Sequence, residues 1–263
     1  MTGEVDRRLA FDAAAESYDL ARPEYPSQIF DDLFAYLGMA AAPRVCEIGP
    51  GTGQATGGLL ARGALVTAVE IGPNLASALR SKFAGEPRLS VVLGAFEEVA
   101  LPQAAFDLVV AATSWHWLAA ETRVAKAVSL LRPSGVLATL ATVQVSEPED
   151  RGFFQRGHAV YERHGRRERF TPGPRAAEVA PAEAVEFMAS ALLRDVQVRT
   201  YRWDQRYSAG QYEHLLRSYS DIQAMPPSER ESLIADLKAL IAAEFDGYVV
   251  RPLVIALTMA RRS

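Results

Sequence analysis

Residues 45–54 read Val45-Cys46-Glu47-Ile48-Gly49-Pro50-Gly51-Thr52-Gly53-Gln54, so an apolar run passes directly into a glycine-rich turn. Glycine lets the backbone adopt open dihedral angles and come within contact distance of a ligand. In open α/β sheets, ligands bind beyond the carboxyl ends of the strands, which is where this turn falls. The spacing G-x-G-x-G differs from the G-x-G-x-x-G of most dinucleotide-binding turns. The stretch predicts a ligand-binding strand-to-helix turn, and a tight turn without a ligand is the alternative.

An acidic residue stands at the end of the next predicted strand. Glu70 follows Gly51 by 19 residues. A carboxylate at this position can accept hydrogen bonds from the two hydroxyls of a ribose. Together the turn and Glu70 predict an adenosine-type ligand, without separating a nicotinamide cofactor from S-adenosylmethionine. A solvated acid at a strand end is the alternative for Glu70 alone.

Short apolar runs alternate with amphipathic stretches around this turn, which is the pattern of βαβ units and a parallel sheet. We expect one sheet with helices on both faces and a cap made of inserted segments. Ser228 and Glu231 predict a capping box at the start of a late helix, and Ser27 predicts a helix cap near the N-terminus. The predicted strands are 44–49, 65–71, 89–94, 106–112, 135–142, 196–207 and 249–259, and the other helices are 27–37, 53–61, 73–83, 119–131 and 184–193.

The composition is that of an ordinary globular protein, with 263 residues, 49% hydrophobic, and a net charge of -4. The single cysteine, Cys46, cannot form an internal disulfide, and four scattered histidines offer no zinc spacing, so we expect no metal. Residues 1–10 lack the apolar core of a signal peptide and no run is long enough to span a membrane. These features predict a cytoplasmic protein, and the net charge gives no field that favours nucleic acid.

Several further motifs occur in a fixed order along the chain: Phe11…Tyr18-Asp19…Arg22-Pro23…Tyr25-Pro26, Phe106-Asp107-Leu108-Val109, Trp115-His116-Trp117 and Leu131-Arg132-Pro133-Ser134-Gly135. Jointly with the glycine turn and Glu70, they resemble the class I S-adenosylmethionine-dependent methyltransferases. The similarity is to the methyltransferase domain 11 and trans-aconitate methyltransferase-like group, and it covers nearly the whole chain. An NAD-dependent oxidoreductase would explain neither the glycine spacing nor Trp115-His116-Trp117.

The resemblance implies an α/β fold, a Rossmann-like doubly wound seven-stranded sheet whose last strand is antiparallel, with a helical cap. We therefore expect a single methyltransferase domain over 1–263. Its parts would be an N-terminal lid and helix (1–40), a cofactor-binding core (41–145), cap insertions (146–195 and 208–248) and final strands (196–207 and 249–263).

The resemblance also implies the cofactor S-adenosyl-L-methionine, with S-adenosyl-L-homocysteine as its product, and a set of residues around it. Thr113 and Ser114 would lie beside the sulfonium and the acceptor. Family members frequently have Asp where this chain has Ala95, which leaves one adenine contact to another group. The implied cofactor-binding residues are Tyr18, Arg22, Glu47, Gly49, Gly51, Gly53, Gln54, Glu70, Ile71, Ala95, Phe96 and Thr113.

Methyl transfer from a sulfonium is an in-line displacement, so the protein chiefly aligns the reacting atoms and excludes water. For catalysis we single out Tyr18, as an aromatic face beside the sulfonium, and His116, as a base or a positioning residue. A purely structural His116 is the alternative. For the substrate side we single out Trp115, His116, Arg217 and Tyr219.

Between Arg151 and Arg175 the chain has seven arginines against two acids, which predicts either a cap that recruits an anionic small molecule or a solvated helix face. We expect methyl transfer to a small-molecule acceptor, on an oxygen of a carboxylate or hydroxyl. Methylation of carbon or nitrogen, and a noncatalytic protein that binds S-adenosylmethionine, are the alternatives. The expected partner is a small molecule, with no nucleic acid and no membrane, for a monomer or homodimer.

Overall fold

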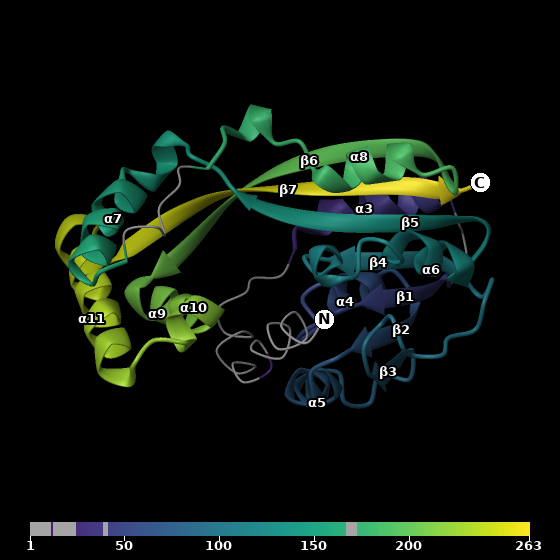
Figure 1. Cartoon of the computed structure of the whole chain (residues 1–263), viewed down its shortest axis with the longest axis horizontal. Helices are drawn as coiled ribbons and strands as arrows, with labels where there is room; N and C mark the ends of the chain where they lie inside the picture. The colour runs from purple at the N-terminus through teal and green to yellow at the C-terminus, as the bar shows by residue number, and fades with distance from the viewer. Residues whose placement is uncertain (1–11, 13–24, 39–41, 167–172) are drawn as a thin grey trace.

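The computed structural model describes residues 12, 25–38, 42–166 and 173–263. In these residues one seven-stranded sheet has the order β3-β2-β1-β4-β5-β7-β6 (Figure 1). Strands β1 to β5 are parallel, and β7 runs antiparallel to both β5 and β6. The predicted doubly wound sheet with an antiparallel last strand is confirmed. The strands are β1 Arg44–Ile48, β2 Leu65–Glu70, β3 Leu89–Leu93, β4 Phe106–Ala112, β5 Leu131–Gln144, β6 Leu193–Ser208 and β7 Tyr248–Arg262.

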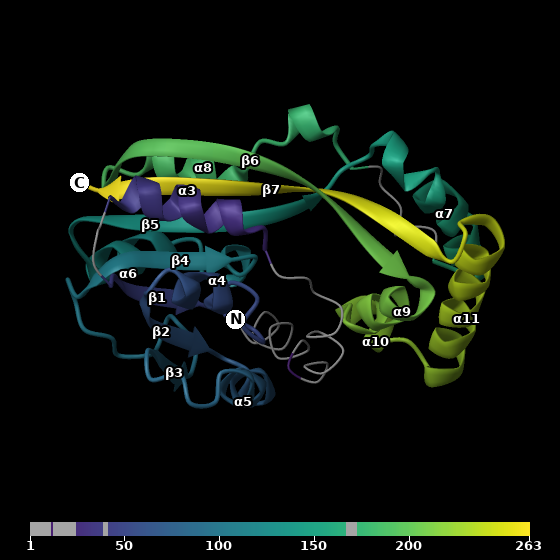
Figure 2. The ribbon, with the colours of Figure 1, turned by 180° about the vertical axis from the view of Figure 1, so that it is seen from behind.

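Helices cover both faces of the sheet, so the central strands β1, β2 and β4 are largely buried on both sides. On one face α3 (Ser27–Leu37) and α4 (Thr56–Ala61) share a core with Val45, Ala68 and Leu257 (Figure 2). On the other face α6 (Arg123–Leu130) and α8 (Ala182–Ala189) pack on Cys46, Val109 and Leu137. Helix α5 (Pro73–Lys82) follows β2 and contacts β2 and β3.

The cap is built on the far ends of β6 and β7. The last pair between β5 and β7 is Gln144 with Leu253, whereas β6 pairs with β7 as far as Tyr248. This projecting ribbon carries α7 (Phe153–Arg163), α9 (Ala209–Arg217), α10 (Ser220–Gln223) and α11 (Pro227–Glu244), seen together at one end of Figure 1. Phe153, Tyr212 and Phe245 pack edge to face there, within a separate buried cluster.

Several element boundaries differ from those predicted. Helix α4 begins at Thr56 instead of residue 53, because the glycine turn continues through residues 51–55. Strand β5 begins at Leu131, which was expected to end a helix. The predicted capping box at Ser228 is wrong: Pro226 precedes α11 without any side-chain cap. The Ser27 cap is also wrong, since α3 follows Pro26 and no side chain caps it.

Two features are absent from the described residues. None of these helices is long and apolar enough to cross a membrane. The same part of the chain holds no group of three or more metal-binding side chains.

Candidate functional site

A cavity of about 260 Å³ opens at the carboxyl ends of β1, β2 and β4. We call it the glycine-loop cavity. The turn after β1 contributes its floor, the loop after β2 one wall, and the loops after β3 and β4 the others. Its lining residues are Ile48, Gly49, Gly51, Val69, Glu70, Ile71, Leu75, Gly94, Phe96, Ala112, Thr113, Ser114, His116, Trp117, Leu118 and Thr142.

The turn needs glycine at two positions for different reasons. Gly49 has φ +62°, and a Cβ there would lie 2.7 Å from the Cβ of Ser114, whose hydroxyl donates a hydrogen bond to the carbonyl of Ile48. Gly53 has φ +96°, and its Cβ would lie 2.5 Å from Cε2 of Phe83, which ends α5. Gly49 therefore keeps the floor of the cavity close to β4, whereas Gly53, which does not line the cavity, allows close packing against α5.

The Glu70 carboxylate joins the two loops that border the cavity. Its Oε2 accepts a hydrogen bond from the Gly51 N–H at 3.0 Å, and its Oε1 accepts one from the Gly72 N–H at 2.9 Å. The side chain is 3% exposed; burial raises its pKa, and these hydrogen bonds oppose that shift. Each carboxylate oxygen has two lone pairs, so both can accept a further bond from a ligand. This pair of acceptors fits the two hydroxyls of a ribose.

The start of α5 beside Glu70 is fixed by an N-terminal residue. Oδ1 of Asp12 accepts a hydrogen bond from the Leu75 N–H at 2.8 Å, and the Asp12 carbonyl accepts one from Asn74. A Cβ on Gly72 would lie 2.5 Å from Asp12 Oδ1. The expected lid residues Tyr18 and Arg22 lie outside the described residues.

Glu47 lies under the turn and not on the cavity surface. Its Oε2 accepts a hydrogen bond from the Thr56 hydroxyl at 2.7 Å, and its buried Oε1 has no partner among the described residues. Burial raises its pKa to about 7, the Thr56 bond opposes the shift, and the nearby Glu70 charge adds to it. Gln54, also expected near the cofactor, donates to the Thr52 hydroxyl and lines a different cavity described below.

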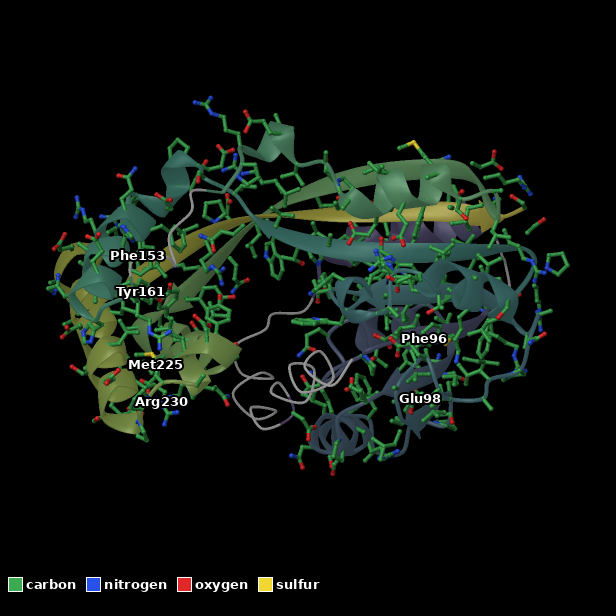
Figure 3. All side chains as sticks on the ribbon, in the orientation of Figure 1. Phe96, Glu98, Phe153, Tyr161, Met225 and Arg230 are labelled. Atoms are coloured by element: carbon green, nitrogen blue, oxygen red, sulfur yellow. The ribbon has the colours of Figure 1, made fainter. Side chains whose placement is uncertain are left out.

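The opposite wall of the glycine-loop cavity is aromatic and apolar. Phe96 is buried and lines it, with the Lys126 ammonium 5.3 Å from the ring centroid (Figure 3). Ile71 lines the cavity beside Glu70. Ala95 does not line it; its carbonyl accepts hydrogen bonds from the N–H groups of Glu98 and Val99. Ile71 and Phe96 thus give the cavity apolar surfaces of the kind against which a flat group such as adenine packs.

The motif Trp115-His116-Trp117 is split between core and cavity. Trp115 is 2% exposed, donates from its indole to Glu186, packs on Phe187 and lines no cavity described here. His116 and Trp117 line the glycine-loop cavity, with ring centroids 4.9 Å apart. Desolvation lowers the pKa of His116, Arg123 adds to the shift and Glu183 opposes it, so the imidazole is neutral at pH 7.

Thr113 stands between the glycine-loop cavity and a second one. It is a β-branched residue with φ +54°, a strained conformation for this residue type. Its hydroxyl oxygen lies 3.3 Å from the Tyr25 hydroxyl. The second cavity, about 230 Å³, is called the tyrosine cavity. It is lined by Tyr25, Gly49, Pro50, Gln54, Ala55, Ala112, Thr113, Thr142, Gln144, Trp203, Tyr207, Leu215, Tyr219, Arg251 and Leu253.

A third cavity of about 980 Å³, the cap cavity, lies between α7 and the projecting end of β7. It shares Gln144, Tyr219 and Arg251 with the tyrosine cavity, so the three cavities form a series. Figure 3 labels Phe153 and Tyr161, which line its α7 side. Of the arginine run, Arg151 and Arg175 line this cavity.

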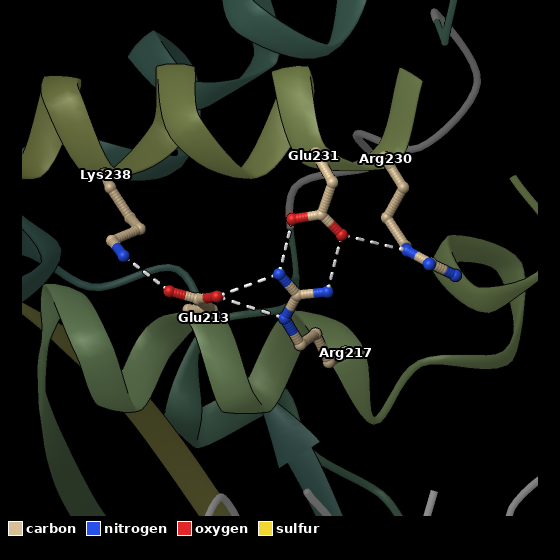
Figure 4. Close-up of polar contacts among 5 residues, drawn as sticks. All are labelled: Glu213, Arg217, Arg230, Glu231 and Lys238. Atoms are coloured by element: carbon tan, nitrogen blue, oxygen red, sulfur yellow. Dashed lines mark hydrogen bonds and ion pairs between the residues drawn. The ribbon is translucent and has the colours of Figure 1, made fainter. Parts of the chain in front are cut away.

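The two expected substrate residues of the cap have different positions. Arg217 lines none of the three cavities: its guanidinium lies 2.9 Å from Glu213 and 2.6 Å from Glu231, while Lys238 binds the other oxygen of Glu213 (Figure 4). Tyr219 lines both the tyrosine cavity and the cap cavity. The network joins α9 to α11 and gives Arg217 a structural role.

Sequence reasoning missed Arg251. On β7, Leu257, Ile255 and Leu253 alternate toward the face covered by α3 and α4, and Arg251 is the next residue of that series. On β5 the same face carries Leu140 in the apolar core and, farther along, Gln144 on the cavity surface. The change from apolar to polar at one face of two paired strands is a signal that the sequence does contain.

The residues around the glycine turn are similar to those of known methyltransferases. Residues 46–139 match the family model described as "Methyltransferase domain". An uncharacterized methyltransferase from Mycobacterium tuberculosis is 36% identical over 132 residues, 50% of this chain and 51% of that protein. The chain therefore spans about half the length of the curated relatives it matches. A ribosomal RNA small subunit methyltransferase A from Synechococcus is 53% identical over 58 residues, 22% of this chain and 21% of that one.

The fold is also found among solved structures. The phosphoethanolamine N-methyltransferase 2 of Haemonchus contortus, in complex with phosphomonomethylethanolamine and S-adenosylhomocysteine, superposes with a TM-score of 0.54 at 15% identity. The alignment covers 95% of this chain and 57% of that one, which shows a shared fold. The matched segment includes the glycine turn, Glu70 and Phe96. Residues 46–139 therefore match a methyltransferase domain, and the chain shares the fold of a solved methyltransferase.

Proposed function

We propose that the chain binds S-adenosylmethionine in the glycine-loop cavity and promotes methyl transfer to an oxygen of a small molecule in the tyrosine cavity. The observation that carries the proposal is the junction of the two cavities, which share Gly49, Ala112, Thr113 and Thr142. A donor held on one side and an acceptor held on the other would meet at Thr113. Alignment of this kind is the main requirement of a displacement reaction.

The residues of the glycine-loop cavity support the choice of cofactor. Glu70 would hold the ribose hydroxyls, Ile71 and Phe96 would enclose the adenine, and the Gly49–Gly51 turn would pass beneath the methionyl part. When bound, S-adenosylmethionine supplies a methyl group on a positively charged sulfur, which an acceptor oxygen takes as the carbon–sulfur bond breaks, leaving S-adenosylhomocysteine. Trp117 and His116 would cover this side of the cavity and exclude water.

The lining of the tyrosine cavity supports an oxygen acceptor that is already ionised. None of its described lining residues is Asp, Glu or His, so these residues supply no ordinary general base. A hydroxyl or an ammonium group must lose a proton to react, whereas a carboxylate is ionised at pH 7. His116 lines the other cavity and would position groups there instead of accepting a proton from the acceptor.

A small molecule fits this cavity better than a nucleic acid does. The tyrosine cavity measures about 230 Å³, and the net charge of -4 gives the chain no overall positive field that would attract phosphates. The cytoplasmic location and the monomeric or homodimeric state stay predictions.

Calorimetry tests the cofactor, and a transfer assay tests the reaction. We expect binding of S-adenosylmethionine and S-adenosylhomocysteine and no binding of NAD. Transfer of labelled methyl groups is expected to matched carboxylic acids before their alcohols and amines. Binding of NAD in place of the adenosyl ligands contradicts the cofactor assignment. Tight cofactor binding without transfer to acids, phenols or amines would favour the noncatalytic alternative.

A further inference from the structure

Arg251 is a cation inside the series of cavities. It is partly buried on β7, opposite Gln205 of β6, and it lines both the tyrosine cavity and the cap cavity. The neighbouring positions on the same face are Leu253 and Ile255, which are buried and apolar. A guanidinium in such a place has lost much of its water and requires compensation from the protein or from a ligand.

The described residues that bond to the Arg251 guanidinium are neutral. Nε and Nη2 of Arg251 donate to Oε1 of Gln144, with the Nε–Oε1 distance at 3.2 Å, and Nη1 donates to the Tyr219 hydroxyl at 2.7 Å. No Asp or Glu among the described residues forms an ion pair with it. Arg123 and Arg132, by contrast, pair with Glu186 and Asp107 at 2.8 and 2.9 Å. Within this part of the chain, the positive charge of Arg251 is therefore not balanced by a carboxylate.

Two N–H groups of Arg251 have no partner among the residues that the structure describes. A guanidinium has five N–H groups, and the hydrogen bonds to Gln144 and Tyr219 use three of them. Gln144 and Tyr219 line the same two cavities and hold the guanidinium in place there. Two N–H groups on one planar cation match the two oxygens of a carboxylate or of a phosphate.

We propose that Arg251, held by Gln144 and Tyr219, binds an oxyanion of the acceptor in the tyrosine cavity. The proposal rests on the proposed function, and it adds the substrate class: a carboxylate or phosphate attached to an apolar or aromatic body. Trp203, Tyr207 and Leu253 line the same cavity and provide the surface for that body. Arg251 is thus a specificity-determining residue for the methyl acceptor.

The test measures ligand binding, so it does not depend on turnover. Protein saturated with S-adenosylhomocysteine is titrated with matched pairs: benzoate and benzamide, phenylacetate and phenylacetamide, phenyl phosphate and phenol. Tryptophan fluorescence, to which Trp203 contributes, reports occupancy. We expect the wild type to bind at least one oxyanion about tenfold or more tightly than its neutral partner. The carboxylate and phosphate pairs show which oxyanion is preferred.

Variants assign the preference to one residue. Arg251→Gln is expected to reduce the preference for the oxyanion over its neutral partner by about tenfold or more. Arg251→Lys should keep part of the preference, because Lys retains the charge but not the paired N–H groups of a guanidinium. Arg206→Gln is the matched control: Arg206 is exposed on the same ribbon, rests on the Tyr248 ring and lines no cavity described here. It should bind like the wild type. All variants are first compared by thermal unfolding.

The outcomes separate this inference from the proposed function. An oxyanion preference that persists in Arg251→Gln, or a wild type that prefers no oxyanion over its neutral partner, overturns the inference. If S-adenosylhomocysteine fails to bind the wild type, the proposed function fails, and the same titrations on the ligand-free protein still test Arg251. Normal S-adenosylhomocysteine binding by Arg251→Gln, with the oxyanion preference lost, supports both.

Discussion

The Gly51 N–H donates a hydrogen bond to Oε2 of Glu70 at 3.0 Å, so the turn after β1 and the end of β2 are tied together by one side chain. The other oxygen of Glu70 accepts from Gly72 at the start of α5. The carboxylate thus both shapes the cavity and presents acceptors to a ligand.

We expect Glu70→Ala to weaken S-adenosylhomocysteine binding by at least about tenfold, since it removes the acceptors for the ribose. It should also lower the thermal midpoint of the ligand-free protein, because two buried N–H groups lose their partner. Glu98→Gln, in the exposed loop after β3, is the control and should change neither quantity. Calorimetric affinity equal to the wild type in Glu70→Ala would refute the ribose assignment.

Glu47 should make stability depend on pH. Burial raises its pKa to about 7, whereas an unfolded glutamate titrates near 4.5. Between these values the unfolded chain releases a proton that the folded chain retains, so the stability present below about pH 4.5 is lost as pH rises toward 7. The loss amounts to roughly 3 kcal/mol.

Glu47→Gln removes this titration. Urea unfolding at several pH values between 4.5 and 7 should show a smaller decrease in the free energy of unfolding for the variant than for the wild type. Equal decreases in the two proteins would show that Glu47 does not hold its proton in the folded state.

Thr113 should be strained. Its φ of +54° suits glycine, so we expect Thr113→Gly to be more stable than Thr113→Ala by about 1 kcal/mol. Both variants lose the contact with Tyr25, so their difference reports mainly the backbone conformation at this position. Denaturant unfolding of the two proteins measures it, and a less stable glycine variant would argue against strain.

Arg217 should matter for stability and not for binding. Its pairs with Glu213 and Glu231 join α9 to α11, and the Arg217 and Glu231 side chains are 28% and 53% exposed. Solvent screening limits such pairs, so Arg217→Ala should cost about 1 kcal/mol or less. A double-mutant cycle with Glu231→Ala isolates the pair. S-adenosylhomocysteine and oxyanion affinities should not change; a large loss of either would place Arg217 in the site.

The sheet was largely predictable from sequence because its strands are buried apolar runs separated by turns. Strand β4 and helix α3 match their predicted bounds, and the cavity at the glycine turn follows from the strand-to-helix geometry. Helix starts were less predictable, since Glu231 serves a distant Arg217 instead of a local cap. A motif of neighbouring residues cannot show that Glu231 pairs with a residue on another helix.

The side chains that line the cavities could not be predicted from the sequence. Trp115 and Trp117 are two residues apart, yet one is in the core and the other lines the cavity, because the short helix Trp115–Trp117 turns between them. Arg251 comes together with Gln144 and Tyr219 only through the pairing of β5 with β7 and the placement of α9. Such long-range pairings decide which charges face the cavity.

A crystal structure of the protein with S-adenosylhomocysteine tests the cofactor assignment most directly. The expected electron density shows the ribose hydroxyls on Glu70, the adenine between Ile71 and Phe96, and the sulfur directed toward Thr113. An empty glycine-loop cavity in crystals saturated with the ligand, or the ligand bound elsewhere on the chain, would contradict it.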